Sequence, residues 1–492
     1  MLKLNSVLTA GAVTLAGFQA PAQKPAALKA ATPNIIIILM DDMGYGDIGT
    51  TGANQYDTPN LDRLASQGMQ FTWFYSPQAV SSASRAGLLT GCYPNRVGIT
   101  GALMPWSTIG INSDETTIAE VLKTRGYHTA AFGKWHVGHQ REFLPLQHGF
   151  DEYYGLPYSN DMWPVDFDGV PIHLRDTTSR LMRYPVLPLI EGNEKIGEIT
   201  DLSGQDKLTA EYTRRAVEFI ERHRKEPFFL YLPHSMVHVP LGVSEKFRGK
   251  SRQGLYGDVM MEVDWSVGEI VKAVDKNGLA KKTLIIFTSD NGPWLNFGNH
   301  AGTTGGLREG KGTTWEGGQR VPCIMRWTGV IPAGEICNRL ASSIDFLPTV
   351  AAITGAKLPG KKIDGVNILP LMLGDKNTTP RHELYYYYKT NSLEAVQRDY
   401  WKLVLPHRNN QSYRYVDPGK DGWPGPYGSE TIYSPELYDL RRDPGEWYDV
   451  AALYPEKVKE LQDLAGEARR DLGDEITGDP GTGRRQPGTI KE

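Results

Sequence analysis

Ser81 and Arg85 stand four residues apart in a segment of small residues, which predicts a turn leading into a short helix. Ser81 would lie just before that helix, where free backbone N–H groups favour an anion. Arg85 follows about one helical turn later, so both side chains can face the same point. A nucleophile and a guanidinium at a helix N-terminus suit a sulfate or phosphate substrate. An ordinary serine-capped helix with a solvated arginine explains this short motif equally well.

Two pairs of oxygen-bearing side chains follow apolar runs that predict buried parallel strands. Asp41 and Asp42 follow residues 34–40, and Asp290 and Asn291 follow the run that begins at residue 283. Ligand sites in open α/β sheets gather at the carboxyl ends of strands. Adjacent carboxylates repel each other unless a cation or a shared proton stabilises them, and oxygen ligands favour Ca²⁺ or Mg²⁺. These four residues and one oxygen of Ser81 would form a Ca²⁺ shell, with an exposed acidic turn as the alternative for Asp41 and Asp42.

Lysines and histidines follow two further strand-like runs. Lys134 and His136 alternate after the apolar run 127–132, so both side chains can point the same way. His234 and His238 follow the run 227–232 in one loop. Two histidines in a loop can bind zinc, but no third ligand of the right kind stands near them in the sequence.

Lys311 lies in a glycine-rich segment, residues 305–318, whose backbone can approach a ligand closely. A Walker-type phosphate loop needs Gly-Lys followed by Ser or Thr at the start of a helix, and Gly-Lys-Gly at 310–312 does not fit. Lys311 therefore provides a point charge outside a nucleotide loop.

The elements that must position these residues alternate along the first three quarters of the chain. Buried strands alternate with amphipathic helices, which predicts an α/β fold with a large, mainly parallel sheet sandwiched by helices. The alternation stops near residue 375, so we expect a catalytic domain over 23–375 and a C-terminal α+β subdomain over 376–492. In that subdomain, runs at 384–388 and 400–405 predict antiparallel strands, and 456–471 predicts a helix. The tail after Gly473 has a composition typical of disorder.

Composition excludes several classes of function. Lys plus Arg is 53 and Asp plus Glu is 57, so a net charge of −4 gives no case for nucleic acid or a membrane surface as partner. The three cysteines have no metal-ligand spacing and allow one disulfide. Residues 1–22 have the pattern of a signal peptide, which predicts export to a periplasm or beyond, without stable membrane insertion.

The longer motifs resemble those of the type I sulfatases, in the arylsulfatase A-like, serine-type branch. The resemblance covers nearly the whole mature chain, in family order, and implies an alkaline phosphatase-like fold. It is carried by residues 81–91 (Ser-Ser-Ala-Ser-Arg, then Leu-Thr-Gly), 41–47, 133–136 (Gly-Lys-Trp-His), 157–159 (Pro-Tyr-Ser), 238–240 (His-Val-Pro) and 310–318 (Gly-Lys-Gly-Thr-Thr-Trp-Glu-Gly-Gly).

The resemblance implies a catalytic scheme in which Ser81 is oxidised to Cα-formylglycine by a maturase acting on the unfolded chain. Its hydrate would attack sulfur while the cation, Arg85, Lys134 and Lys311 offset charge. His238 with Lys311 would protonate the leaving alcohol, and His136 would take the proton that allows sulfate release. The metal ligands would be Asp41, Asp42, Ser81, Asp290 and Asn291.

The substrate is a sulfated glycan or a small sulfate ester, and exo action on galactose or N-acetylgalactosamine 4-sulfate is our expectation. Ser159 would lie beside the sulfate. The long segment 162–200 would form a pocket wall. The candidate substrate contacts are Ser159, Asp161, His234, His173 and Arg175, with Trp163 as a further candidate and ordinary surface positions as the alternative for those in and beside that segment. Two other functions stay open: a phosphatase or phosphodiesterase that uses unmodified Ser81, and a sulfoglycan-binding protein with a decayed site.

Overall fold

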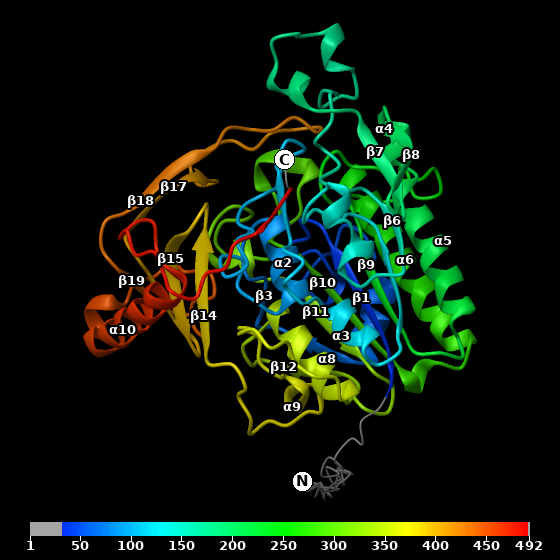
Figure 1. Cartoon of the computed structure of the whole chain (residues 1–492). Helices are drawn as coiled ribbons and strands as arrows, with labels where there is room; N and C mark the ends of the chain where they lie inside the picture. Colours follow the sequence, from blue (N-terminus) through cyan, green and yellow to red (C-terminus); the bar gives the residue numbers. More distant parts are fainter. Residues whose placement is uncertain (1–31, 491–492) are drawn as a thin grey trace, which may run out of the picture.

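The structure, a computed structural model, describes residues 32–490, so the predicted signal peptide lies outside the described residues. A ten-stranded sheet forms the centre of the molecule (Figure 1), in the order β12-β2-β11-β10-β1-β9-β5-β6-β7-β8. Its middle is parallel, and the outer strands on each side include antiparallel neighbours. The parallel strands are β10 (Thr283–Ser289), β1 (Asn34–Met40), β9 (Phe228–Pro233), β5 (His128–Phe132) and β6 (Glu152–Gly155). The outer strands are β11 (Cys323–Arg326), β2 (Met69–Phe71), β12 (Glu335–Cys337), β7 (Leu187–Glu191) and β8 (Glu194–Ile199).

Strand β1 is apolar after Asn34, as expected of a strand in a sheet that helices cover on both faces. Ile36 and Ile38 belong to one buried cluster and Ile35 and Ile37 to the other. The first cluster includes residues of α1 (Pro59–Ser66), α5 (Leu208–Arg222) and α6 (Leu255–Lys276). The second includes residues of α2 (Ser81–Thr90), α3 (Ile118–Lys123), α8 (Phe346–Thr354) and α9 (Leu369–Met372). The predicted sandwich is confirmed.

A second, smaller sheet follows α9. It is antiparallel, in the order β14-β15-β16-β19, and α10 packs against β15 and β16. A separate two-stranded ribbon, β17–β18, arches away from this sheet toward the top of Figure 1. The bounds are β14 (Glu383–Tyr388), β15 (Ser392–Arg398), β16 (Trp401–Val404), β17 (His407–Ser412), β18 (Gly428–Ile432), β19 (Glu436–Asp439) and α10 (Pro455–Leu472).

The tail after Gly473 is packed, which corrects the expectation of disorder. Asp474 is fully buried and accepts a hydrogen bond from the Leu393 N–H group. Arg485 forms an ion pair with Glu115 at 2.6 Å, and β20 (Gly488–Thr489) pairs with β4 (Ile109–Gly110). The tail is polar because it packs against polar groups and backbone strands from much earlier in the chain. Composition alone does not reveal these distant partners.

Three further local features complete the fold. Helix α3 begins at Ile118, because Thr117 and Glu120 form a capping box. The segment 162–200, expected as a pocket wall, ends in the β7–β8 hairpin, which extends the large sheet. The three cysteines, Cys92, Cys323 and Cys337, are free.

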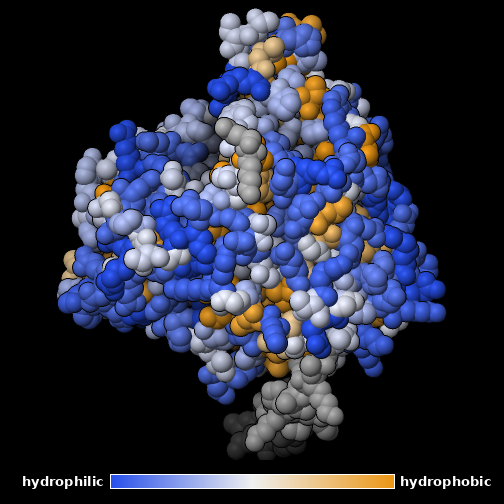
Figure 2. Space-filling model, viewed as in Figure 1, coloured by the Kyte–Doolittle hydropathy of each residue, from blue (hydrophilic) through white to orange (hydrophobic). Residues whose placement is uncertain are grey.

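The surface seen in Figure 2 is dominated by hydrophilic residues, with apolar side chains in small scattered groups. Among residues 32–490, no helix is both long enough and apolar enough to span a bilayer.

Candidate active site

Ser81 is the first residue of α2, whereas the sequence placed it just before the helix. Val80 precedes it in an extended conformation, as the N-cap residue. Ser81 is 2% exposed, and its hydroxyl donates a hydrogen bond to Asp41 Oδ1 at 3.0 Å. The hydroxyl therefore lies at a helix N-terminus and beside a carboxylate at the end of β1.

The two predicted carboxylate pairs meet because β1 and β10 are parallel neighbours that end in register, with Met40 opposite Ser289. The Asp42 N–H group donates to Asp290 Oδ1 at 3.2 Å. Asn291 Nδ2 donates to Asp42 Oδ1 at 2.7 Å. Asp42 adopts a left-handed backbone, φ 60°, at the point where the chain leaves the strand.

These residues fit a hard divalent cation. Asn291 Oδ1 is buried without a hydrogen-bond partner, as expected of an oxygen that is free to bind a metal. Asp41, Asp42 and Asp290 provide carboxylates beside it, all buried. Such a set of oxygen atoms is the donor chemistry of Ca²⁺ and Mg²⁺ sites.

Two buried cations balance the carboxylates. Arg85 donates from Nε to Asp290 Oδ2 at 2.9 Å and from Nη1 to the Lys134 carbonyl at 2.7 Å. Lys134 Nζ contacts Asp41 Oδ2 and lies 3.1 Å from Ser159 Oγ and 3.4 Å from Ser81 Oγ. Burial raises the pKa of Asp41, but Lys134 and Arg85 outweigh burial and hold that pKa well below its ordinary range.

A cavity of about 430 Å³ opens above Ser81. Its walls come from α2 and from loops of the catalytic region on one side, and from β14, β17 and the residues next to them on the other. A second cavity of about 590 Å³ shares five lining residues with the first, so the two adjoin. The shared residues are Asp161, Arg180, Tyr184, Trp294 and Tyr427.

His238 and Lys311 line the first cavity on the side of Asp42. Lys311 Nζ lies 2.9 Å from Asp42 Oδ2 and 4.1 Å from the centre of the Trp294 ring. His238 Nδ1 bonds to the Val239 carbonyl, which leaves Nε2 free, 3.6 Å from Asp42 Oδ2. Burial and then Lys311 lower the pKa of His238, while Asp42 raises the pKa of Lys311 against the effect of burial.

His136 lines the same cavity as a neutral base. Its Nε2 donates to the Leu103 carbonyl at 2.9 Å, and its Nδ1 is buried without a partner. Burial, followed by Lys134, lowers the pKa of His136 well below its ordinary value. The free Nδ1 can therefore accept a proton.

Three predicted substrate contacts lie outside this cavity. His234 is fully buried, with Nε2 3.2 Å from Ser266 Oγ, and burial lowers its pKa to about 3. His173 is exposed, and Arg175 pairs with Asp166 and Asp168. Sequence placed them by proximity to motifs, but the direction of a side chain in a loop depends on the contacts of that loop.

Two other candidate substrate contacts lie in the lining of this cavity. Ser159 and Asp161 line the cavity above Ser81, and Asp161 Oδ1 is buried without a hydrogen-bond partner. Trp163 lines the adjoining cavity.

Several lining residues were not predicted. Most come from segments that no active-site motif marks, and they reach the cavity only because the chain crosses back over it. Two of them carried a signal: Trp294 follows Asp290 and Asn291 closely in sequence, and Arg180 lies in the segment 162–200 that was expected to form a pocket wall. The lining residues that were not predicted are Trp294, Arg180, Tyr388, Lys389, Gln411 and Tyr427.

A hydroxyl nucleophile, buried carboxylates and flanking ammonium groups at the carboxyl edge of an α/β sheet define a hydrolase of oxyanion esters. The chain belongs to the sulfatase family, which it matches over residues 33–356. Residues 380–478 match the C-terminal region of aryl-sulfatase.

Individual relatives agree. The chain is 39% identical to arylsulfatase A from Bos taurus over 467 residues, which cover 88% of this chain and 87% of the relative. It is 38% identical to N-acetylgalactosamine-6-sulfatase from Mus musculus over 446 residues, covering 85% and 82%. The structure of the PsFucS1 sulfatase from Pseudoalteromonas sp. superposes with a TM-score of 0.80, at 28% identity, over 92% of both chains. The protein is a sulfuric ester hydrolase, and the predicted enzyme class and fold class are confirmed.

Proposed function

We propose that the protein is an exo-acting carbohydrate sulfatase that acts on sulfated galactose or N-acetylgalactosamine through a formylglycine derived from Ser81. The observation that carries the proposal is the position of the Ser81 hydroxyl, between Asp41 and Lys134 at the base of a cavity. Loops of the catalytic region and residues of β14 and β17 line this cavity together, which favours entry of a terminal sugar over the middle of a chain and supports exo action.

Ser81, Lys134, Lys311 and the oxygen ligands have distinct roles in this proposal. Conversion of Ser81 to formylglycine supplies an aldehyde carbon, and with it a nucleophilic oxygen and a route for sulfate release that serine lacks. A bound Ca²⁺, or alternatively Mg²⁺, held by Asp41, Asp42, Asp290, Asn291 and an oxygen of residue 81, supplies positive charge beside the sulfuryl oxygens. Lys134 and Lys311 provide fixed ammonium groups on either side of the same oxygens.

Arg85 acts differently from the two lysines, because its guanidinium is fully buried behind the carboxylates. It binds Asp290 and the Lys134 carbonyl, so it fixes the geometry of both the metal ligands and a sulfate-binding lysine. We propose Arg85 as a positioning residue as well as a source of charge.

Two histidines handle protons in the proposal. His238 Nε2 faces the cavity and would give a proton to the leaving sugar oxygen, with Lys311 beside it. His136 Nδ1 would accept the proton that is lost when sulfate is released.

The adjoining cavity supports a sugar as the leaving group. Trp163, Phe167, Trp294 and Phe297 line it, and aromatic faces are suited to stacking on sugar rings. Four carboxylates line it as well, Asp161, Asp166, Asp168 and Asp421. Arg175 pairs with Asp166 and Asp168, and Arg180 lines the same cavity, so the lining combines charges of both signs with the aromatic faces, which suits a galactose or N-acetylgalactosamine residue. We keep the 4-sulfate as the expected position, and the relation to an N-acetylgalactosamine-6-sulfatase makes the 6-sulfate the first competitor.

Maturation and location belong to the same proposal. Ser81 is 2% exposed in the folded protein, so a formylglycine-generating maturase has to act on the unfolded chain. Export to a periplasm or beyond agrees with the signal-peptide pattern of residues 1–22.

The first test is mass spectrometry of the peptide that contains Ser81, from protein made in its native host. Loss of two hydrogen atoms from serine is the expected result. Unmodified serine in fully active protein would overturn the formylglycine assignment. Ser81→Ala should abolish turnover while leaving the thermal unfolding transition in place.

The second test is a substrate panel of galactose and N-acetylgalactosamine bearing 4- or 6-sulfate, sulfated glucosamine, 4-nitrophenyl sulfate and 4-nitrophenyl phosphate. We expect the highest kcat/KM for a 4-sulfated galactose-type sugar. Preference for sulfated glucosamine, or for the phosphate ester, would contradict the proposed substrate class.

A further inference from the structure

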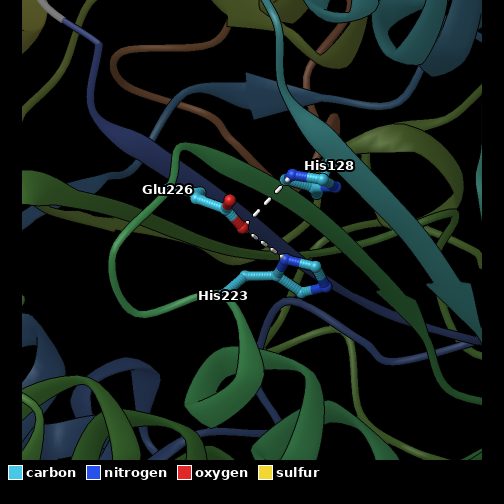
Figure 3. Close-up of side chains that lie close together, drawn as sticks. All are labelled: His128, His223 and Glu226. Atoms are coloured by element: carbon cyan, nitrogen blue, oxygen red, sulfur yellow. Dashed lines mark hydrogen bonds and ion pairs between the residues drawn. The ribbon is translucent and has the colours of Figure 1, made fainter.

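A cluster of three side chains converges on one point where α5 ends and β5 begins (Figure 3). The three residues are His128, His223 and Glu226. His128 Nε2 and His223 Nδ1 each lie 3.3 Å from the same oxygen, Glu226 Oε2. The two imidazole rings stack with their centres 4.4 Å apart, and the three ligand atoms lie within 4.8 Å of one another. The catalytic scheme uses none of these residues.

Such distances fit both a histidine–carboxylate ion pair and a transition-metal site. Two ligand atoms bound to zinc at about 2.0–2.2 Å with tetrahedral angles lie about 3.3 Å apart. Both nitrogen-to-oxygen distances match that edge length. We propose that His128, His223 and Glu226 bind one zinc ion, with water completing the coordination shell.

The backbone holds all three ligands in place. His223 and Glu226 stand three residues apart in a turn closed by a hydrogen bond from the Glu226 N–H group to the His223 carbonyl, 3.0 Å. The His128 N–H group donates to the Pro227 carbonyl at 3.0 Å, and His128 then pairs with Phe228 where β5 meets β9. Little ordering remains to be done on binding, which favours affinity.

The surroundings suit a cation that arrives from solvent. Glu152 Oε1 lies 3.9 Å from His223 Nε2, and Glu152 neutralises Arg222 at 2.7 Å. The side chains of His128 and Glu226 are 43% and 56% exposed. Imidazole nitrogens prefer zinc to calcium, so this site and the oxygen-rich active site select different ions.

The proposed zinc site is separate from the active site. His128 starts β5, whereas Lys134 follows the carboxyl end of the same strand. Six residues of extended chain span about 20 Å. Zinc would connect the C-terminal end of α5 to the start of β5, so we expect an effect on stability and none on the chemistry.

The test uses the full chain loaded with Ca²⁺, titrated with zinc chloride in a calorimeter at pH 7.5. We expect His223→Ala and Glu226→Gln each to remove one equivalent of zinc binding. At a hundredfold excess over Kd, zinc should raise the Tm of the wild type by about 2 °C or more and leave the Tm of both variants unchanged. The affinity should fall at pH 5.5, because imidazoles must lose their protons to bind metal.

His382→Ala is the matched control. His382 pairs with Asp399 at 2.7 Å on the surface, without a second imidazole. It should keep the full zinc stoichiometry, and all variants should keep sulfatase activity, which shows that they fold. Equal zinc binding by wild type and His223→Ala, or none by the wild type, would overturn the proposal and leave a plain histidine–carboxylate ion pair.

Discussion

Lys311 Nζ lies 2.9 Å from Asp42 Oδ2, although 269 residues separate them in the chain. The contact brings the ammonium group of a glycine-rich loop to the carboxylates at the end of β1. It also orients Lys311 over Trp294, at the entrance to the aromatic cavity. The pair therefore connects the proposed cation site with the proposed position of the leaving group.

This arrangement predicts a leaving-group dependence for His238→Ala. Loss of a general acid costs about 10²–10⁴-fold in rate. We expect a loss of that size with a sulfated sugar and a much smaller one with 4-nitrophenyl sulfate, whose phenolate needs no proton to leave. Steady-state kinetics with the two substrates measures the difference.

His234→Gln is the matched control, because His234 lies in the same loop but outside the cavity. This variant should change the rates with the two substrates by the same factor, if it changes them at all. An equal loss with both substrates in His238→Ala would contradict the role of His238 as a general acid.

Asn291→Ala tests the metal site. Removing the unpaired Oδ1 atom should raise the Ca²⁺ concentration for half-maximal activity by about tenfold or more. Chelation of the wild type should lower both activity and Tm, because the buried carboxylates then repel one another. Activity as a function of free Ca²⁺ gives the half-maximal concentration, and calorimetry gives the Tm.

Asn296→Ala is the control for this change, since Asn296 also has a buried, unpaired Oδ1 but stands in the adjoining cavity. Its calcium dependence should equal that of the wild type. If Asn291→Ala shows the same calcium dependence, Asn291 is not a ligand.

The burial of His148 predicts that the folded protein loses stability in acid. It is fully buried, neither ring nitrogen has a partner, and burial lowers its pKa to about 4. The unfolded chain has the ordinary pKa of about 6.5, so between pH 6.5 and 4 it binds more protons than the folded chain. Stability therefore falls as the pH drops through that window, by about 3 kcal/mol for this one group.

His148→Phe keeps the ring beside Trp135 and removes the titration. The difference in free energy of unfolding between pH 7.5 and pH 4.5 should shrink by about 2–3 kcal/mol in this variant. Denaturant unfolding at the two pH values measures this difference. An unaltered pH dependence in His148→Phe would contradict a buried, neutral His148.

The packed tail predicts that Arg485→Ala destabilises the protein. It would leave Glu115, which is 4% exposed, with only the more distant Lys361 at 3.8 Å, at a cost of about 3 kcal/mol, the low end for a broken buried pair. Arg484→Ala, at an exposed position, should have no effect. Calorimetry gives both Tm values, and equal values would contradict a structural role for the tail. Activity at low temperature should persist in both, because neither residue lines the cavity above Ser81.

The sheet, the strand ends and the reactive groups could be predicted from the sequence. The apolar run of β1 requires cover on both faces, and the polar residues directly after β1, β5, β9 and β10 have to meet at one edge. Asp41, Lys134 and His238 were found this way. Ser81 was found at the start of a helix and Lys311 in a glycine-rich segment, and longer motifs resemble one family. Those signals are local, since periodicity and neighbouring residue types depend only on positions close together in the chain.

Tertiary structure alone decided what depends on distant segments meeting. It placed His238 in the cavity and buried His234 against Ser266, although both follow β9 in one loop. It packed the polar tail against Glu115 and β4 and brought Tyr388 and Gln411 over Ser81. The contacts of the tail and of the cavity wall join residues hundreds of positions apart, and His234 and Ser266 stand 32 residues apart. The free energy of these contacts comes from complementary groups that become neighbours only after the chain has folded back on itself.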